Sequence, residues 1–378
     1  MPNLIINDGR GTRKEQLGNQ EVISSGGVPP VYRELLPHLG GERLLDYGSW
    51  QGIAGLAAAR KGSRVTWGDY LHSRLQAAVL NAEKNGIAAE ALAMFPPAPA
   101  DYATVVLEAL PSPEALAMLL AQARSAANKR VLVADPHGAG RLSDTDGRVL
   151  AGGEGWTLYE FEPLAARPDL PWRQFTAAVR GVEVAVASLP GMFSPLGLDT
   201  GTKLMLETMD VPSGARPRVL DLGCGTGVVG LVCSRLGAGE VVYIDDDLIA
   251  LTACRRNLAA AGADGLIIHN HRPAAVQGEF DLILTNPPYH TEYGVASSFL
   301  EFAARRLRLG GWLYVVVKKP DWYLRKLRTL FGGCRIIEGA GYTVLAASRK
   351  ERRAIPAKPK TTKKHLRRQA AAKGRGKG

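Results

Sequence analysis

The sequence predicts two doubly wound α/β domains in tandem, followed by a basic tail. Two segments 175 residues apart, Arg43–Leu56 and Arg218–Leu231, match one another, and each reads as an apolar strand, a glycine-rich turn and a helix start. Such units build parallel sheets covered by helices. The 378 residues also exceed one typical core. We expect an N-terminal domain over residues 1–180, a second domain over 181–348 and a tail over 349–378.

The match between the two copies continues further along the chain. With one added residue, Asp69 falls on Asp245, and a helix expected over Leu71–Asn85 falls on one expected over Leu248–Ala261. Between the copies, Phe175–Leu189 alternates between apolar and polar residues, as strands do. An internal repeat of this length indicates a duplicated domain.

The N-terminal copy is degenerate where a cofactor and a substrate would bind. Trp50 stands where the second copy has Gly225, so a large ring replaces bare backbone. Ala109–Ser112 stands where the second copy has Asn286–Tyr289. We expect this copy to recognise the substrate or to act as a scaffold for the second domain.

The composition favours a globular, cytoplasmic protein without a metal. No apolar run approaches the length of a membrane span, and Met1–Lys14 has no signal-peptide core. Four cysteines lack the spacing of a zinc site or a disulfide framework, which predicts free thiols. They are Cys224, Cys233, Cys254 and Cys334.

The basic charge of the chain belongs to its tail. Residues 349–378 carry 13 Lys and Arg against one acidic residue, a net charge of +12. The preceding 348 residues hold 34 basic and 35 acidic side chains, a net charge of −1. With few apolar residues to bury, the tail is expected to be disordered in solution and to bind RNA electrostatically.

The second copy contains the pattern of a nucleotide-cofactor pocket. The buried strand Val219–Leu222 runs into Gly223–Gly227, a turn that brings backbone close to a ligand and opens a helix. Gly225–Gly230 also satisfies the dinucleotide pattern GxGxxG, with Asp245 about 20 residues on, so a nicotinamide cofactor stays possible on this turn alone.

Three features favour S-adenosylmethionine. Asp221 precedes the turn, as is typical of methyltransferases; Asp245 stands at an acidic strand end and takes the ribose; and Asn270 follows the next strand, where adenine is contacted. Asp247 can cap the next helix. The residues expected to bind the cofactor are Asp221, Gly223, Cys224, Gly225, Gly227, Asp245, Asp246 and Asn270.

A catalytic motif follows the strand Phe280–Leu284. Asn286-Pro287-Pro288-Tyr289 stands at the carboxyl end of that strand, where ligands bind in open α/β sheets. An exocyclic or amide-type nitrogen is a weak nucleophile. The Asn286 side-chain oxygen and the Pro287 carbonyl can accept its N–H groups and direct its lone pair at a methyl donor. The prolines stiffen the loop, and Tyr289, with Pro288, offers a surface for the target base.

On these residues the chain resembles the RsmC family of ribosomal RNA guanine-N2 methyltransferases, which have two Rossmann-like class I methyltransferase domains. The resemblance covers residues 20–348 and includes Leu189–Ser194, Gly197–Thr202 and the catalytic motif. It implies that only the second domain binds S-adenosylmethionine. It also implies that the Phe193 loop and the stretch Asp199–Thr202, which contains Thr200, close over the target base and the cofactor.

The resemblance implies N2-methylation of a guanosine in small-subunit (16S) ribosomal RNA. The expected partner is ribosomal RNA or the small subunit, with no membrane and no metal, and the chain is expected to be a monomer. Large-subunit rRNA, a glutamine side chain of a protein, and an RNA-binding ribosome assembly factor without activity remain alternatives. A nicotinamide dehydrogenase would leave Asn286–Tyr289 unexplained.

Overall fold

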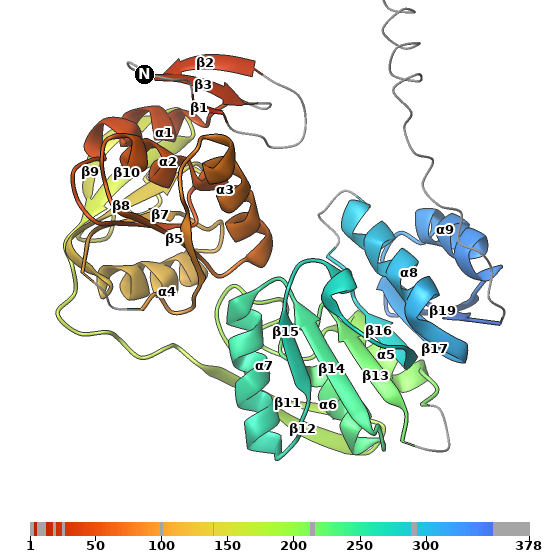
Figure 1. Ribbon diagram of the computed structural model, residues 1–378. Helices are drawn as coiled ribbons and strands as arrows, with labels where there is room; N and C mark the ends of the chain where they lie inside the picture. Colours follow the sequence, from red (N-terminus) through yellow and green to blue (C-terminus); the bar gives the residue numbers. More distant parts are fainter. Residues whose placement is uncertain are drawn as a thin grey trace, which may run out of the picture.

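The protein folds into two α/β units that lie side by side, as Figure 1 shows for this computed structural model. The predicted duplication is therefore visible as two separate sheets with helices on both faces. Two further, smaller sheets accompany them. The structure describes residues 4–5, 13–17, 20–24, 27–98, 101–138, 140–211, 216–288 and 293–350.

The N-terminal unit has a seven-stranded sheet of order β6-β5-β4-β7-β8-β10-β9, in which β10 pairs antiparallel with both β8 and β9. Its strands are β4 (Leu44–Tyr47), β5 (Val65–Asp69), β6 (Glu90–Ala93), β7 (Tyr102–Glu108), β8 (Ala127–Asp135), β9 (Arg148–Gly153) and β10 (Trp156–Phe161). Its helices are α1 (Pro30–Leu35), η1 (Leu36–His38), η2 (Trp50–Gly52), α2 (Ile53–Arg60), α3 (His72–Lys84) and α4 (Pro113–Arg124). The strands β1 (Leu4–Ile5), β2 (Arg13–Leu17) and β3 (Gln20–Ser24) form a separate sheet of order β1-β3-β2.

The C-terminal unit repeats this order strand for strand, as β15-β14-β13-β16-β17-β19-β18. Its strands are β13 (Arg218–Leu222), β14 (Glu240–Asp245), β15 (Leu266–His269), β16 (Phe280–Thr285), β17 (Leu307–Val317), β18 (Arg335–Gly339) and β19 (Tyr342–Ser348). Its helices are α5 (Thr200–Thr208), α6 (Val228–Arg235), α7 (Leu248–Ala261), η3 (Pro273–Ala275), α8 (Gly294–Arg306) and α9 (Asp321–Phe331). Both units have the class I methyltransferase fold.

Equivalent side chains make equivalent hydrogen bonds in the two units. Asp46 accepts the Gly55 N–H through Oδ2 at 2.7 Å, and Asp221 accepts the Gly230 N–H in the same way at 2.9 Å. Each carboxylate joins the first strand to the first turn of the helix that follows the glycine-rich loop. The duplication has therefore kept interior polar contacts as well as the backbone fold.

A hairpin joins the two units, formed by β11 (Arg173–Val179) and β12 (Val182–Ser188). Its inward valines lie in one apolar core with α5, α6, α7 and one face of the seven-stranded C-terminal sheet, whose opposite face packs against α8 and α9. Both strands thus pack with the C-terminal unit, although the expected boundary at residue 180 falls in their turn. None of the helices in the described residues is long and apolar enough to cross a lipid bilayer.

The two units dock through equivalent segments. The Leu248 N–H donates to the Tyr70 carbonyl at 2.8 Å, and the His72 N–H donates to the Asp246 carbonyl at 3.0 Å. Leu71 forms an antiparallel bridge with its counterpart Asp247. Since residues 70, 71 and 72 align with 246, 247 and 248, the contact is self-complementary, like a two-fold dimer interface within one chain.

Candidate functional site

A cavity of about 570 Å³ lies at the carboxyl edge of the C-terminal sheet. The connections after β13, β14, β15 and β16 line it, together with the loop between β12 and α5 and part of α8. Ligands bind at this edge in open α/β sheets. The predicted site residues that line it are Phe193, Asp221, Gly223, Cys224, Gly225, Asp245, Asp246, Asn270, Asn286, Pro287 and Pro288.

Among the predicted residues that the structure describes, Gly227 and Thr200 do not line the cavity. Gly227 forms the left-handed N-cap of α6 (φ +78°), and a Cβ there would lie 2.6 Å from the Cys254 sulfur. Its role in the described structure is to allow close packing. Thr200 is exposed at the start of α5, whereas its neighbours Asp199 and Thr202 line the cavity. Tyr289 falls outside the described residues.

The glycine-rich turn presents bare backbone to the cavity. Gly225 has a φ of +54°, and an added Cβ would meet no atom within 4 Å. At Gly223 (φ +76°) the nearest atom would be a Phe299 ring carbon at 3.7 Å. Side chains here would enter open space, so the turn leaves room for a ligand against the backbone. A cavity of this size with such a turn fits a nucleoside-type cofactor.

Asp245 closes the turn from the end of β14. Its Oδ2 accepts the Gly225 N–H at 2.8 Å and its Oδ1 accepts the Asp247 N–H at 3.0 Å. Burial raises the pKa of Asp245 from its usual range. Asp247 caps α7, as the sequence predicts, by accepting the Ile249 N–H at 2.8 Å, and burial raises its pKa to about 7.

Asp221 lies beneath the turn with 2 % of its surface exposed. Burial raises its pKa to about 8, although the Gly230 N–H hydrogen bond opposes the shift. In the structure this residue therefore supports α6 and also contributes to the cavity wall.

The raised pKa of Asp221 predicts a pH-dependent stability of the ligand-free protein. Between its usual value of 3.8 and about 8, the folded state keeps a proton that the unfolded state releases. Stability from this group is complete below 3.8 and is lost as pH rises to about 8, by ~1.4 kcal/mol per pH unit at most. We expect Asp221→Asn to lose less stability than wild type between pH 5 and 8 in urea unfolding. Parallel losses in the two proteins would contradict this assignment.

Asp246 and Asn270 border the N-terminal unit. Asp246 accepts the Ser73 N–H at 2.7 Å and the Ser73 hydroxyl at 2.5 Å, so it ties the two units together beside the cavity. Asn270 closes a local turn by accepting the Arg272 N–H at 2.9 Å. Ser73 lines the cavity itself, which makes the N-terminal unit part of its wall.

A histidine pair lies at the same border. The Nδ1 atoms of His72 and His271 are 2.7 Å apart, and burial lowers the pKa of both rings. Neutral imidazoles can share one proton in such a contact. With Asp246 they form the single group of metal-ligand types found within the described parts of the chain.

The amide of Asn286 is held at the end of β16 by two acceptors. Its Nδ2 donates to Asp199 Oδ2 at 3.0 Å and to Thr202 Oγ1 at 2.9 Å. Asp199 also accepts the Tyr342 hydroxyl at 3.1 Å through its other oxygen. Because a carboxylate only accepts, these bonds orient the amide with Nδ2 toward α5 and Oδ1 as its opposite end.

The residues around Asn286 make its surroundings partly apolar. Pro287 is buried, Pro288 is exposed, and both line the cavity. Phe193 lies across the cavity on the loop before α5, with 62 % of its surface exposed. A partly open aromatic ring beside a polar acceptor suits a flat ligand.

The N-terminal unit fills the equivalent space with its own side chains. Arg74 donates to both oxygens of Asp69, the counterpart of Asp245, at 2.9 Å each. Gly48 corresponds to Gly223, but a Cβ there would lie 2.7 Å from Arg74 Nη2. The carboxylate slot is therefore occupied by an internal ion pair.

Strand register moves the counterpart of Asn286 by one residue from the predicted Ala109. Asp46 pairs with Val106, two residues before Glu108, just as its counterpart Asp221 pairs with Leu284, two residues before Asn286. Sequence alignment alone misplaces this counterpart because the two copies have no residue in common at the end of these strands. The Tyr32 hydroxyl, from α1, donates to the Glu108 carboxylate and accepts the Trp50 N–H, at 2.7 Å in the latter case.

Sequence reasoning missed Tyr342 and Ser73, and it named the Asp199–Thr202 stretch without predicting the contact of Asp199 and Thr202 with Asn286. Asp199 and Thr202 carry the signal of a capped helix start, with the Asp199 side chain accepting the Thr202 N–H at 2.9 Å. That signal marks the beginning of α5 and says nothing of Asn286, 87 residues away. Ser73 lies in the degenerate copy, where no motif marks it.

Comparisons with known proteins agree with this geometry. Residues 183–346 match the model of the methyltransferase small domain. The small-subunit rRNA methyltransferase C of Pseudomonas entomophila is 37% identical over 195 residues, which cover 50% of this chain and 56% of that protein. That of Sodalis glossinidius is 34% identical over 48% of this chain and 52% of its own length. The chain thus spans little more than half the length of these curated relatives.

A solved structure extends the likeness over both units. The T. thermophilus 16S rRNA N2 methyltransferase (RsmC), in complex with AdoMet and guanosine, matches with a TM-score of 0.73 and 27% identity. The match covers 90% of this chain and 98% of that one. Together with the paired sheets, the open glycine turn and the held amide of Asn286, these likenesses show that the chain is similar to RsmC over both units and that residues 183–346 resemble the methyltransferase small domain.

Proposed function

We propose that this protein transfers the methyl group of S-adenosylmethionine to N2 of a guanosine in small-subunit ribosomal RNA. The observation that carries the proposal is the clamped amide of Asn286 at the edge of the cavity. The two hydrogen bonds hold the Asn286 side-chain oxygen, the proposed acceptor, in one orientation before the substrate arrives. This preorganisation lowers the entropic cost of the reaction.

The chemistry follows from the weakness of the nucleophile. The N2 lone pair of guanine is delocalised into the ring, so the amine attacks poorly while it stays planar. Asn286 Oδ1 and the Pro287 carbonyl accept its two N–H groups and favour a pyramidal nitrogen. The bound cofactor supplies an electrophilic methyl on a sulfonium. After transfer the positive nitrogen loses a proton readily, so no strong base and no metal ion is needed.

The cofactor is assigned to the turn Gly223–Gly227 and the strand ends beside it. Asp245 is proposed to accept the ribose hydroxyls, with Asp221 near the methionine end. Asp246, Asn270, Cys224 and Thr200 complete this assignment. Open space at Gly225, where a side chain would meet nothing, supports it.

The target base has to leave its stack to reach Asn286. Extrusion costs about a few kcal/mol, partly recovered by stacking in the pocket. We assign that stacking to Tyr289 and Pro288 on one side and Phe193 on the other. The exposed ring of Phe193 at the cavity supports this assignment.

One assay tests the function. The protein is incubated with S-adenosylmethionine labelled in its methyl group and with small ribosomal subunits or their RNA, and the RNA is digested to nucleosides. Label in N2-methylguanosine is the expected result. Label in another nucleoside or in a protein, or none at all, would overturn the proposal.

The basic tail is proposed to raise the affinity for RNA. Its residues 351–378 lie outside the described structure, and their high positive charge supports this role. Deleting residues 350–378 should weaken RNA binding strongly at low salt and little at high salt, because counterion release drives such contacts. Filter binding at several salt concentrations measures this, and a loss independent of salt would argue against an electrostatic arm.

We further propose that the chain acts as a monomer in the cytoplasm, where ribosomes are made. The self-complementary contact between equivalent segments is already made within one chain, which supports a monomer.

A further inference from the structure

A cluster of aromatic and basic side chains lies on α8, α9 and the end of β17, near Val295 and Phe299, the residues of α8 that line the cavity. β16 and β17 run parallel, with Thr285 opposite Val315. Residues that follow these strands therefore leave the same edge of the sheet, about 4.8 Å apart. Pro288 follows β16, and Lys318 and Lys319 follow β17, so both lysines lie one strand away from the catalytic loop.

The aromatic part of this cluster is held rigidly. The rings of Tyr293, which precedes α8, and Trp322, in the first turn of α9, stack with centroids 4.5 Å apart and an angle of 17°. Tyr323 packs edge-on against the Tyr293 ring at 6.1 Å. Tyr293 nevertheless keeps 46 % of its surface exposed. Such a ring is a preformed stacking platform.

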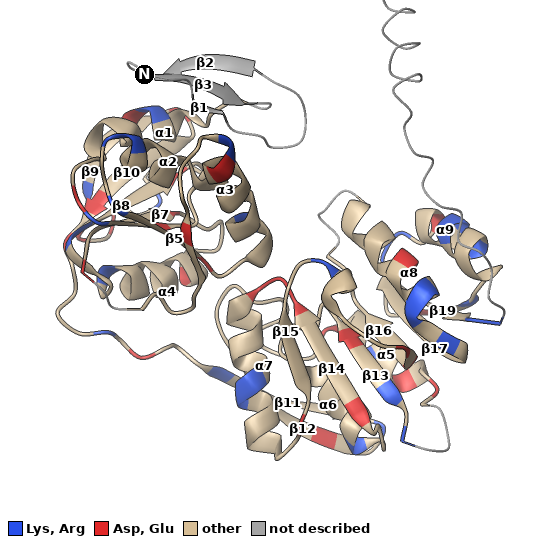
Figure 2. Ribbon diagram, viewed as in Figure 1, with Lys and Arg blue, Asp and Glu red and all other residues tan. Residues whose placement is uncertain are grey.

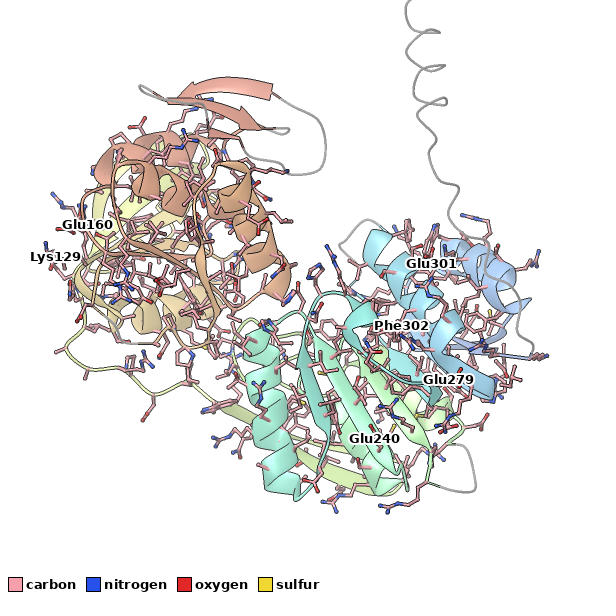
Figure 3. The ribbon with its side chains drawn as sticks, in the orientation of Figure 1. Lys129, Glu160, Glu240, Glu279, Glu301 and Phe302 are labelled. Atoms are coloured by element: carbon pink, nitrogen blue, oxygen red, sulfur yellow. The ribbon has the colours of Figure 1, made fainter. Side chains whose placement is uncertain are left out.

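The charge of this region differs from that of the rest of the body. Residues 318–328 contain five basic side chains and one acidic side chain, whereas residues 1–348 as a whole carry a net charge of −1. Figure 2 shows several blue segments, the colour of Lys and Arg, on α9. Lys326 is paired with Glu301 on α8 at 2.6 Å, and Figure 3 labels Glu301. Lys319 and Arg325 are exposed, and neither forms an ion pair with any residue that the structure describes.

We propose that this cluster is the surface on which the RNA flanking the target nucleotide is held. It is called here the aromatic–basic rim and consists of Tyr293, Lys319, Trp322 and Arg325; Lys318 is not part of it, because its ammonium lies 5.0 Å over the Tyr342 ring. The inference rests on the proposed function, since it names the surface of the folded domains that binds the same RNA substrate.

The chemistry of the rim matches single-stranded RNA better than other partners. Lys319 and Arg325 supply positive charge for phosphates, and Tyr293 supplies a flat face for a base next to the extruded one. An acidic peptide would use the charge but leave the exposed aromatic face without a role. Stacking and charge together, beside a pocket for a base, are the combination that nucleic acid uses.

The aromatic part is tested by comparing Tyr293→Leu with Tyr293→Phe in the full chain. Tyr293→Leu should raise the KM for subunit RNA about 5- to 100-fold, with kcat and the cofactor Kd unchanged. Tyr293→Phe keeps the stacking face and should stay near wild type. A KM within twofold of wild type for Tyr293→Leu would overturn the inference.

The charged part is tested through the salt dependence of RNA affinity. The pair Lys319→Gln and Arg325→Gln should lower the slope of log K against log salt by about 1.4, the value for two phosphate contacts on a single strand. The matched control is Arg255→Gln with Arg305→Gln. Both control residues are exposed; Arg255 is on α7, and Arg305 is at the far end of α8, about 20 Å from Tyr293. An equal change of slope in the control would overturn the assignment to the rim.

Three further outcomes distinguish a failure of this inference from a failure of the proposed function. If the rim variants bind protein-free RNA like wild type and lose affinity only for the assembled subunit, the rim contacts protein and the inference is wrong. If the wild-type chain methylates no guanosine of ribosomal RNA, the proposed function itself fails. Normal methylation with unaffected rim variants would overturn the rim alone.

Discussion

Replacing Asn286 by alanine is expected to reduce methyl transfer by at least about 10²–10³-fold, the scale seen when one preorganised polar contact to a reacting group is removed. The variant loses the oxygen that accepts an N–H of the target amine. It also leaves Asp199 and Thr202 without the amide that they hold at 3.0 and 2.9 Å. Single-turnover transfer from labelled cofactor measures the effect.

The control for this prediction is cofactor affinity. Gly225 and Asp245, which are assigned to the cofactor, make their mutual hydrogen bond without Asn286. Calorimetry should therefore give a cofactor Kd within a few-fold of wild type. Undiminished transfer in Asn286→Ala would rule out the mechanism, and an equal loss of cofactor binding would mean that Asn286 acts on the cofactor instead.

Replacing Arg74 by methionine is expected to destabilise the protein by about 3–5 kcal/mol, because it leaves a buried carboxylate without its partner. Asp69 is 3 % exposed, and both of its oxygens accept from Arg74. Burial already raises the pKa of Asp69, and removal of the guanidinium takes away the largest opposing influence. Urea unfolding at neutral pH measures the loss.

A second substitution identifies the cause of that loss. Combining Arg74→Met with Asp69→Asn removes the buried charge and should restore much of the stability. A loss below about 1 kcal/mol in Arg74→Met would mean that the pair is solvated and contributes little. A double variant as unstable as the single variant would mean that the stem of Arg74 matters through packing.

Sequence comparison predicted two doubly wound α/β domains in tandem, and the structure has them, because duplication preserves the interior. Asp46 and Asp221 keep the same backbone contact, and such residues also align in the sequence. The hairpin β11–β12 had no counterpart to align with, so its membership in the C-terminal core could not be foreseen. Which unit the hairpin belongs to depends on the apolar surface against which it packs in the folded protein.

The candidate site was predictable where a backbone motif defines it. Glycines that must adopt a positive φ and prolines that stiffen a loop are visible as letters, and the residues Gly225 and Pro287 line the cavity as a result. The contact of Asp199 with Asn286 and that of Ser73 with Asp246 were not predictable. They join segments 87 and 173 residues apart, and only tertiary packing brings them together.

The self-complementary docking of Tyr70–His72 on Asp246–Leu248 constrains how the two halves of this chain can diverge. An ancestor with one such domain could pair with a second copy of itself through this same edge, and fusion of the two genes would keep the contact. Once joined, one half is free to lose its pocket, but it must keep the strand end and helix start that meet the other half. This accounts for an N-terminal copy in which Trp50 and Arg74 occupy the former pocket while the docking segment between them, Tyr70–His72, is retained.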